Sequence, residues 1–311
     1  MTNKIVVLSG GVGGARFLEG LIQVVPQNEI VVIGNTGDDE LFYGLHVSPD
    51  LDIVMYTLSG VVNVDQGWGL TDESYTVMEE LTALGNESWF MLGDKDLATH
   101  IHRTQLLNQG KTLTEVTKNI AEHLGLALTI LPMSNDRVPT IIRTPHGNIP
   151  FQEYFVKNRW KDEVLDIIYS KSKKAQPSPG ILEAIRDAQA IIVTPSNPLV
   201  SIDTILSIPG IKDALKKTKA NIAAISPIIS GATIKGPADK MMKAMGIEVS
   251  AVGVAKHYRD FLDVMIVDNK DKKLIKEINS WGIKAIATDT IMKNKKIKKE
   301  LASTVLHTLQ S

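Results

Sequence analysis

An apolar segment, a glycine-rich turn and a helix start follow one another in residues 4–17, which read KIVVLSGGVGGARF. This order predicts a β-strand that leads through a tight turn into a helix. Glycine has no Cβ to keep an anion away, and the free N–H groups of the first helical turn can face that anion. We therefore expect a phosphate site here, with a plain strand-to-helix turn as the alternative. The expected phosphate-binding glycines are Gly10, Gly11, Gly13 and Gly14.

The turn matches neither of the two common nucleotide fingerprints. A G-x-G-x-x-G loop beginning at Gly11 would need a third glycine where the chain has Arg16, and the Lys-Ser/Thr pair of a Walker loop is missing. Arg16 lies one helical turn into the expected helix, where its guanidinium could bind a second phosphate through two hydrogen bonds. A surface arginine is the alternative.

Composition excludes several classes of function. The formal net charge of -1 provides no general attraction to nucleic acid or to an anionic membrane. The chain has no cysteine, so disulfides, thiol catalysis and zinc-thiolate sites are excluded. No apolar stretch approaches the length of a membrane span, and Met1-Thr2-Asn3 lead directly into the first expected strand rather than into a signal sequence. We expect a soluble, cytoplasmic protein.

Strand-like and helix-like segments alternate along the chain, which is typical of an α/β fold. We expect a Rossmann-like, largely parallel sheet with helices on both faces, in a single domain spanning residues 1–311. A proline-interrupted stretch breaks the alternation and predicts a small β-containing insertion or lobe at approximately 132–175. Strands are expected at 4–9, 29–34, 126–131, 190–194, 221–225, 263–267 and 284–287. Helices are expected at 14–25, 71–84, 96–107, 112–123, 180–188, 238–245, 272–281 and 293–309.

Four aspartates follow the second expected strand, near the sheet edge where ligands bind in open α/β folds. They are Asp38, Asp39, Asp50 and Asp52. Asp38 or Asp39 could hold the ribose of a nicotinamide cofactor, since they follow the glycine turn at about 20 residues. They could equally bind Mg²⁺, which prefers carboxylates, waters and phosphate oxygens. Turn-forming aspartates are the remaining alternative.

A second cluster, at 89–100, reads WFMLGDKDLATH. One of its aspartates, Asp94 or Asp96, would cap the following helix. His100 and His102 stand two residues apart and so point to different faces, which argues against a paired metal site. Trp68 and Trp89 are candidate walls for a flat aromatic ligand, with core packing as the alternative.

Two later loops suit a nucleotide. The first follows an apolar strand and offers hydroxyl and amide groups that could read a base edge or cap a helix. The second is rich in small residues and carries one lysine, with a proline at a helix start. The candidate residues are Thr194, Pro195, Ser196 and Asn197 in the first loop, and Ser230, Gly231 and Lys235 in the second.

Taken together and in this order, five segments of the chain resemble the 2-phospho-L-lactate transferase family, over nearly the whole length of the sequence. They are SGGVGGARF at 9–17, NTGDD at 35–39, SPD at 48–50, GDKDLATH at 93–100 and TPSNP at 194–198. Members of that family transfer a lactyl phosphate, or its enolpyruvyl counterpart, from a guanosine diphosphate conjugate to the deazaflavin Fo. The transfer releases GMP and forms coenzyme F(420)-0.

The resemblance implies a CofD-type α/β fold, a Mg²⁺ requirement, a homodimer, and an acceptor pocket that contains Asp50. On this reading the glycine turn and Arg16 bind phosphates, Asp38 and Asp39 bind Mg²⁺, and residues 194–197 hold the nucleoside. Asp50 would orient or deprotonate the Fo hydroxyl, with Trp68 and Trp89 beside the ring. The resemblance leaves open the three-carbon acid of the donor and the role of Met91. A nucleotide-sugar-binding regulator of related fold and an NAD-dependent dehydrogenase remain as alternatives.

Overall fold

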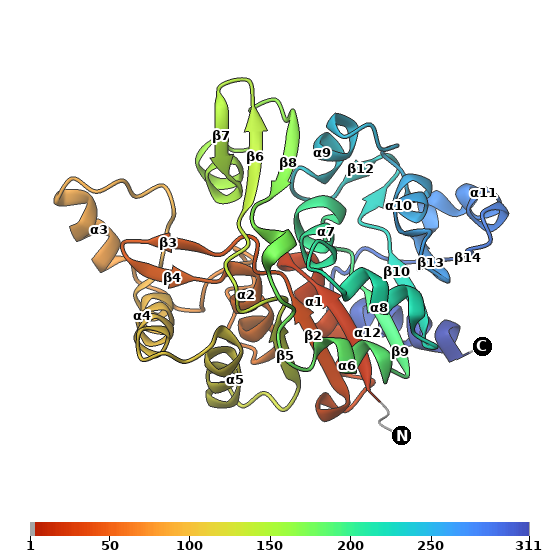
Figure 1. Ribbon diagram of the computed structural model, residues 1–311, viewed down its shortest axis with the longest axis horizontal. Coiled ribbons are helices and arrows are strands. Elements are labelled where there is room, and N and C mark those ends of the chain that lie inside the picture. The colour runs from red at the N-terminus through yellow and green to blue at the C-terminus, as the bar shows by residue number, and fades with distance from the viewer. Residues whose placement is uncertain (1–3, 311) are drawn as a thin grey trace.

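The protein is built around a seven-stranded, entirely parallel sheet, as the computed structural model, which describes residues 4–310, shows (Figure 1). The seven strands predicted from the sequence are the strands of this sheet, so the predicted α/β class is confirmed. Met1-Thr2-Asn3 lie outside the described residues. In spatial order the strands are β5 (Thr129–Pro132), β2 (Ile30–Gly34), β1 (Ile5–Ser9), β9 (Ala190–Val193), β10 (Asn221–Ile225), β13 (Val264–Asp268) and β14 (Lys284–Thr288).

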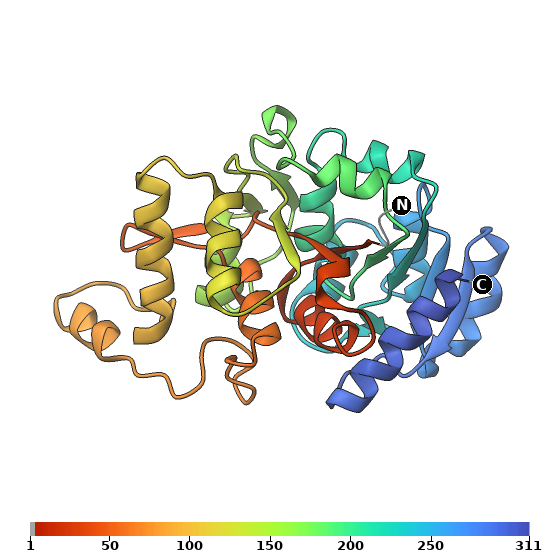
Figure 2. The ribbon, with the colours of Figure 1, turned by 90° about the horizontal axis from the view of Figure 1, so that it is seen from below.

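The sheet is buried on both faces because helices cover each side (Figures 1 and 2). Successive residues of β1 alternate between two cores: Val6 and Leu8 belong to one, and Ile5 and Val7 to the other. The face of Val7 is covered by α1 (Gly11–Leu21), α2 (Pro49–Leu58), α5 (Leu113–His123) and α12 (Lys295–Gln310). The face of Val6 is covered by α6 (Ile181–Arg186), α7 (Asp203–Leu206), α8 (Ile211–Lys217), α9 (Ala238–Ala244), α10 (Ala251–Tyr258) and α11 (Ile275–Ser280).

Helix α5 begins where its sequence indicates. The side chain of Thr112 accepts a hydrogen bond from the backbone of Glu115, and the side chain of Glu115 accepts one from the backbone of Thr112. This capping box satisfies two backbone donors of the first turn, and Gly125 just beyond the helix has a φ of +73°.

Helices α2, α7, α8 and α10 were not predicted. In α2 and α10 almost every residue is buried, so neither has the one-sided apolar pattern that reveals a surface helix. The segment Ser48-Pro49-Asp50 is the start of α2, with Pro49 in the first helical turn. Two predicted helices are shorter: α3 covers Thr76–Ala83, and the start of the segment at 272–281 is a 3₁₀ helix, Asn269–Leu274.

Two substructures project from the sheet and its covering helices. The arm consists of β3 (Glu40–Phe42), β4 (Leu45–Val47), α3 and α4 (Asp94–Asn108), projects to the left in Figure 1, and has a small core of its own. The lobe, at the top of Figure 1, consists of the antiparallel strands β6 (Thr140–Thr144), β7 (Gly147–Pro150) and β8 (Asp166–Tyr169) and a π-helix, Glu153–Lys157.

The remaining elements are short. They are the hairpin of β11 (Ile228–Ile229) and β12 (Ala232–Thr233), the π-helix Pro198–Ile202, and the 3₁₀ helices Gln27–Glu29 and Ser172–Lys174. Across residues 4–310, no helix combines the length and the apolar character needed to cross a bilayer.

Candidate functional site

The sheet has a topological switch point between β1 and β9. From β1 the chain continues outward through β2 and β5, whereas from β9 it continues in the other direction through β10, β13 and β14. Ligands of open α/β sheets bind outside the carboxyl ends of the strands at such a point. A cavity of about 650 Å³ is found there, lined by residues that follow β1, β2, β9, β10 and β14 and by residues of the arm and the lobe.

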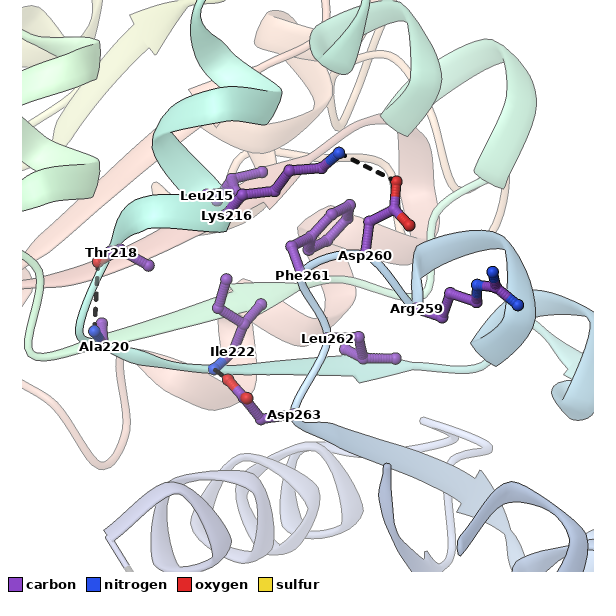
Figure 3. Close-up of a pocket in the computed structure, with 10 residues that line it drawn as sticks. All are labelled: Leu215, Lys216, Thr218, Ala220, Ile222, Arg259, Asp260, Phe261, Leu262 and Asp263. Carbon is purple, nitrogen blue, oxygen red and sulfur yellow. Dashed lines mark hydrogen bonds and ion pairs between the residues drawn. The ribbon is translucent and has the colours of Figure 1, made fainter. Parts of the chain in front are cut away.

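A smaller hollow of about 200 Å³ lies at the amino ends of β10 and β13 (Figure 3). Both of its carboxylates already have partners: Asp260 pairs with Lys212 and Lys216, and Asp263 accepts from the backbone of Ile222. It is therefore a weaker candidate than the large cavity, whose charged groups are described below.

The glycine turn brings three loops together at the end of β1. A Cβ on Gly13 would lie 2.5 Å from the carbonyl oxygen of Pro195, and one on Gly10 would lie 2.6 Å from Cβ of Ser201. Both glycines are therefore required for close packing of the turn against the β9 side. Helix α1 begins at Gly11, whose φ is +62°, three residues earlier than predicted. Gly10, Gly11 and Gly13 line the cavity, but Gly14 does not, because it packs against the side chain of Ser9.

Two buried carboxylates, Asp38 and Asp50, line the floor of the cavity and are only 6% and 7% exposed. Nδ2 of Asn35 donates a hydrogen bond of 2.9 Å to Oδ2 of Asp50, and Oδ1 of Asp38 has no hydrogen-bond partner. Burial raises the pKa of Asp50 to about 6, against the lowering effects of Asn35 and the Gly11 N–H. Burial, and then the charge of Asp50, raise the pKa of Asp38 well above its usual value. A cation bound between them would relieve both effects.

Asp39 does not belong to the cavity lining, although it was predicted to bind metal beside Asp38. Its Oδ2 contacts Nε2 of His46 at 2.9 Å and accepts a hydrogen bond from Ser48 at 2.7 Å. Burial raises its pKa, and its Oδ1 has no partner. No cluster of three or more His, Asp or Glu side chains suited to a metal occurs in the described part of the chain. A metal here would thus take most of its ligands from water and substrate.

Four cationic side chains also line the cavity: Arg16, Arg159, Lys235 and Lys293. Within residues 4–310, none of them takes part in an ion pair. A Cβ on Gly67 would lie 3.8 Å from Nζ of Lys235 and 4.0 Å from Nη2 of Arg16, so these two cations approach the same point. Two unpaired cations in one place favour an anion. Sequence reasoning had identified Arg16 and Lys235 but missed Arg159 and Lys293.

The loop after β9 uses its hydroxyl groups within the protein. Ser196 Oγ accepts from the N–H of Gly10 at 3.1 Å, and Thr194 Oγ1 donates to the carbonyl of Leu8 at 3.0 Å. Pro195, Ser196 and Asn197 line the cavity, whereas Thr194 is buried behind them. Of the three residues predicted in the second loop, Lys235 reaches the lining, beside Thr233 and Ile234 of the same loop. Ser230 and Gly231 do not, and the backbone N–H of Ser230 instead donates to Asp271.

Aromatic side chains cover the outer part of the cavity. Trp68 and Trp89 line it, together with Phe90 and Met91. Trp89 also packs against the core of the arm, with its ring 5.3 Å from that of Phe42 and nearly perpendicular to it. The lobe adds a second aromatic wall that the sequence analysis did not identify, Phe151, Phe155 and Trp160.

The sequence profile of a family described as 2-phospho-L-lactate transferase CofD matches residues 5–309. A phosphoenolpyruvate transferase of Streptomyces griseus is 47% identical over 295 residues, which cover 93% of each chain. A 2-phospho-L-lactate transferase of Methanosarcina mazei is 38% identical over 97% of this chain and 99% of the relative. The chain belongs to the 2-phospho-L-lactate transferase family. It is therefore an enzyme of a transferase family.

The fold is shared with a crystal structure of a Bacillus halodurans protein. The TM-score is 0.65 and the sequence identity 17%, and the likeness covers 98% of this chain and 100% of the other. At that identity the likeness concerns the fold alone.

The family segment at 93–100 lies behind the site, in a buried network between α4 and α2. Arg103, which is 0% exposed, donates from Nη1 to Oδ2 of Asp52 at 3.1 Å and contacts Nδ1 of His100 at the same distance. Tyr56 donates to Asp96 at 2.7 Å. His100 is buried and His102 exposed, so they do face apart. These residues attach the arm to the helix that carries Asp50.

Helix α4 is capped differently from the prediction. Asp94 accepts from the backbone of Thr76 and Val77, so it caps α3 rather than its own helix. The first turn of α4 is capped by Glu73, which accepts from the backbone N–H groups of Lys95 and Asp96. Because this cap lies more than twenty residues away along the chain, local spacing could not reveal it.

Proposed function

We propose that this enzyme transfers a lactyl or enolpyruvyl phosphate group from a guanosine diphosphate conjugate to the deazaflavin Fo. The transfer releases GMP and forms coenzyme F(420)-0. The observation that supports it is that unpaired cations and buried carboxylates line the same cavity, in a chain of a transferase family. Such a cavity suits a diphosphate and a metal together.

The donor's diphosphate would lie at the amino end of α1. Helix α1 has no acidic residue in its first turn, so its N–H groups and its dipole favour an anion. Arg16 and Lys235 would neutralise the phosphates where the two side chains converge over Gly67. Residues 195–197 would hold the nucleoside, with the amide of Asn197 near the base.

Asp38 and Asp50 would hold Mg²⁺ together with phosphate oxygens and waters. Mg²⁺ is commonly bound by one or two carboxylates plus substrate phosphates, so two acidic side chains suffice. When bound, the ion would neutralise charge that develops on the transferring phosphoryl group. Oδ1 of Asp38 is buried and has no hydrogen-bond partner within the protein. This oxygen would therefore be free to bind the ion.

The acceptor would approach from the aromatic side of the cavity, near Trp89, with Trp68 at its edge. Its terminal ribityl hydroxyl would attack the phosphorus that carries the three-carbon acid, and the bond from that phosphorus to the GMP oxygen would break. Asp50 would orient this hydroxyl and receive its proton. Phosphoryl transfer depends mainly on positioning and charge stabilisation, which this arrangement supplies.

The three-carbon acid of the donor is either a lactyl or an enolpyruvyl group. The chain is 47% identical to a phosphoenolpyruvate transferase and 38% identical to a 2-phospho-L-lactate transferase, which favours an enolpyruvyl donor. We also expect a homodimer, as the family resemblance implies; light scattering on the purified protein tests this.

The test of the function is a product assay. The enzyme is incubated with Fo, Mg²⁺ and each of the two guanosine diphosphate conjugates, and the Fo products are separated and weighed by mass spectrometry. We expect an Fo ester and an equal amount of GMP; the lactyl and enolpyruvyl products differ by two hydrogens. Thermal shift with GDP, a UDP-sugar and NAD distinguishes the alternatives, because a ligand at 100 times its Kd stabilises by about 2.7 kcal/mol. Stabilisation by NAD or UDP-sugar alone would contradict the proposal.

A further inference from the structure

The lobe carries a stack of three aromatic rings on the cavity wall. The rings of Phe151 and Phe155 are 5.5 Å apart and 12° from parallel, and those of Phe155 and Trp160 are 5.1 Å apart and 22° from parallel. Phe151 belongs to the core, whereas Trp160, the last ring, is 39% exposed. The stack therefore ends in a large flat surface that borders the cavity.

The turn that presents Trp160 has an unusual backbone. Arg159 and Trp160 are consecutive non-glycine residues with φ of +50° and +45°, a region that L-residues rarely adopt. Such conformations cost free energy and persist where the surrounding structure enforces them, often at ligand sites.

This turn is held from two sides. The N–H of Trp160 donates to the carbonyl of Tyr154 at 2.9 Å. The ammonium of Lys240, on α9, donates to three successive carbonyls, at 2.7 Å for Trp160, 2.9 Å for Lys161 and 2.6 Å for Asp162. Lys240 is not part of the cavity lining, so this cation supports the turn from outside the site.

We propose that Arg159 and Trp160 form the ring subsite of the acceptor: Trp160 stacks on the planar tricyclic ring, and Arg159 faces the acidic hydroxyl of that ring. This rests on the function proposed above. A conjugated ring with an ionisable hydroxyl presents a flat face and a partial negative charge, and a tryptophan beside an unpaired arginine complements both.

The position of the stack favours the acceptor ring over the guanine base. The lobe contacts the arm directly, because Nζ of Lys157 lies 3.0 Å from Oε2 of Glu87 and 5.7 Å above the ring of Trp89. The second aromatic wall thus adjoins the wall where the acceptor is proposed to approach. The nucleoside loop at 195–197 belongs instead to the sheet edge.

The first experiment measures two affinities in Trp160→Leu. Fo is titrated by its fluorescence and GDP by calorimetry. We expect the Kd for Fo to rise about tenfold or more, the usual scale for losing one stacked aromatic, while the Kd for GDP changes less than twofold. Trp281→Leu is the matched control, because Trp281 is 45% exposed and lies outside the cavity lining. Trp160→Phe should retain part of the Fo affinity.

Two further variants test the other parts of the proposed subsite. One removes the charge of Arg159, and the other removes the lysine that holds the turn of Trp160. Arg159→Met should weaken Fo binding above the pKa of the ring hydroxyl and have little effect below it. Lys240→Met should weaken Fo binding without altering any residue of the cavity lining, and circular dichroism should show both variants folded.

Three outcomes overturn the inference. Wild-type Fo affinity in folded Trp160→Leu would place the ring elsewhere. A selective loss of GDP affinity would assign the stack to the guanine base. If the wild-type enzyme binds no Fo, the proposed function fails and this inference fails with it, whereas either of the first two outcomes overturns the inference alone.

Discussion

Asn35 donates a hydrogen bond from Nδ2 to Oδ2 of Asp50 across 2.9 Å, and the same nitrogen lies 3.3 Å from the carbonyl oxygen of Val200. The contact joins the end of β2 to the first turn of α2 and to the π-helix after β9. It thereby orients the Asp50 carboxylate at the junction of three elements that are distant in sequence. The direction in which this carboxylate points is a property of the whole sheet edge.

Asp50→Asn tests the catalytic role of Asp50. The amide keeps the size of the side chain, and its oxygen can still accept from Asn35, but it cannot take a proton. We expect turnover of Fo to fall about 10²-fold or more, the usual scale for a positioned acid or base. GDP affinity measured in EDTA should not fall, because without the metal Asp50 makes no attractive link to the phosphates. Mass spectrometry of the Fo product and calorimetry with GDP measure the two effects. A wild-type rate in this variant would remove Asp50 from the reaction.

The same variant tests the stability of the protein without metal. Burial raises the pKa of Asp50 from 3.8 to about 6 in the folded state. The stability contributed by binding this proton is present below pH 3.8 and is lost as the pH rises through about 6. In EDTA at pH 7, Asp50→Asn should therefore be more stable than wild type by about 3 kcal/mol as an upper estimate. Urea unfolding at pH 7 and at pH 4 measures this, and the advantage should be largely lost at the lower pH.

Mg²⁺ and GDP should bind cooperatively through Asp38. We expect the affinity for GDP to fall when Mg²⁺ is replaced by EDTA, because the carboxylates then repel the phosphates. Asp38→Asn should remove most of the difference between the two conditions, since it removes one of the two charges that face the metal. Calorimetric titrations of both proteins, with and without the metal, give the four affinities. If GDP affinity is equal in all four titrations, Asp38 does not bind the metal and its role is structural.

Gly13→Ala should affect both folding and donor binding. A methyl group on Gly13 would lie 2.5 Å from the carbonyl oxygen of Pro195, so the loop that holds residues 195–197 must move. We expect a lower unfolding temperature and, in the protein that remains folded, at least tenfold weaker GDP binding. Gly85→Ala is a control: Gly85 has a positive φ of +88°, which Gly13 lacks, and no atom lies within 4 Å of its Cβ position. That control should lose stability while its GDP affinity is retained.

Arg103→Met should be among the most destabilising single changes in the arm. It leaves the buried Asp52 carboxylate without its counter-charge, which typically costs about 3–5 kcal/mol. The double variant Arg103→Met, Asp52→Asn removes both charges and should recover a large part of that loss. Urea denaturation of the two variants and the wild type measures the coupling. Additive losses would show that Arg103 and Asp52 act independently.

The local sequence pattern was sufficient to predict the strands of the sheet and some of the residues that line the cavity. Each of the seven strands is a short apolar run bounded by polar or small residues, so its position follows from its own composition. The glycines at 10, 11 and 13, with Arg16, mark the end of β1 in the same way. Because parallel strands carry their ligand sites at one edge, Asp38, Asp50 and residues 195–197 could be expected near them before any contact was known.

Only the tertiary structure decided which of these side chains face the cavity. Asp38 and Asp39 are adjacent and chemically identical, yet the fold directs one to the cavity lining and the other to His46 and Ser48. Thr194 and Gly14 are used for packing within the protein, whereas Arg159 and Trp160, in a segment without a recognised motif, line the cavity. The physical reason is that a motif specifies local backbone and chemistry, whereas the direction of a side chain depends on neighbours brought together from distant parts of the chain.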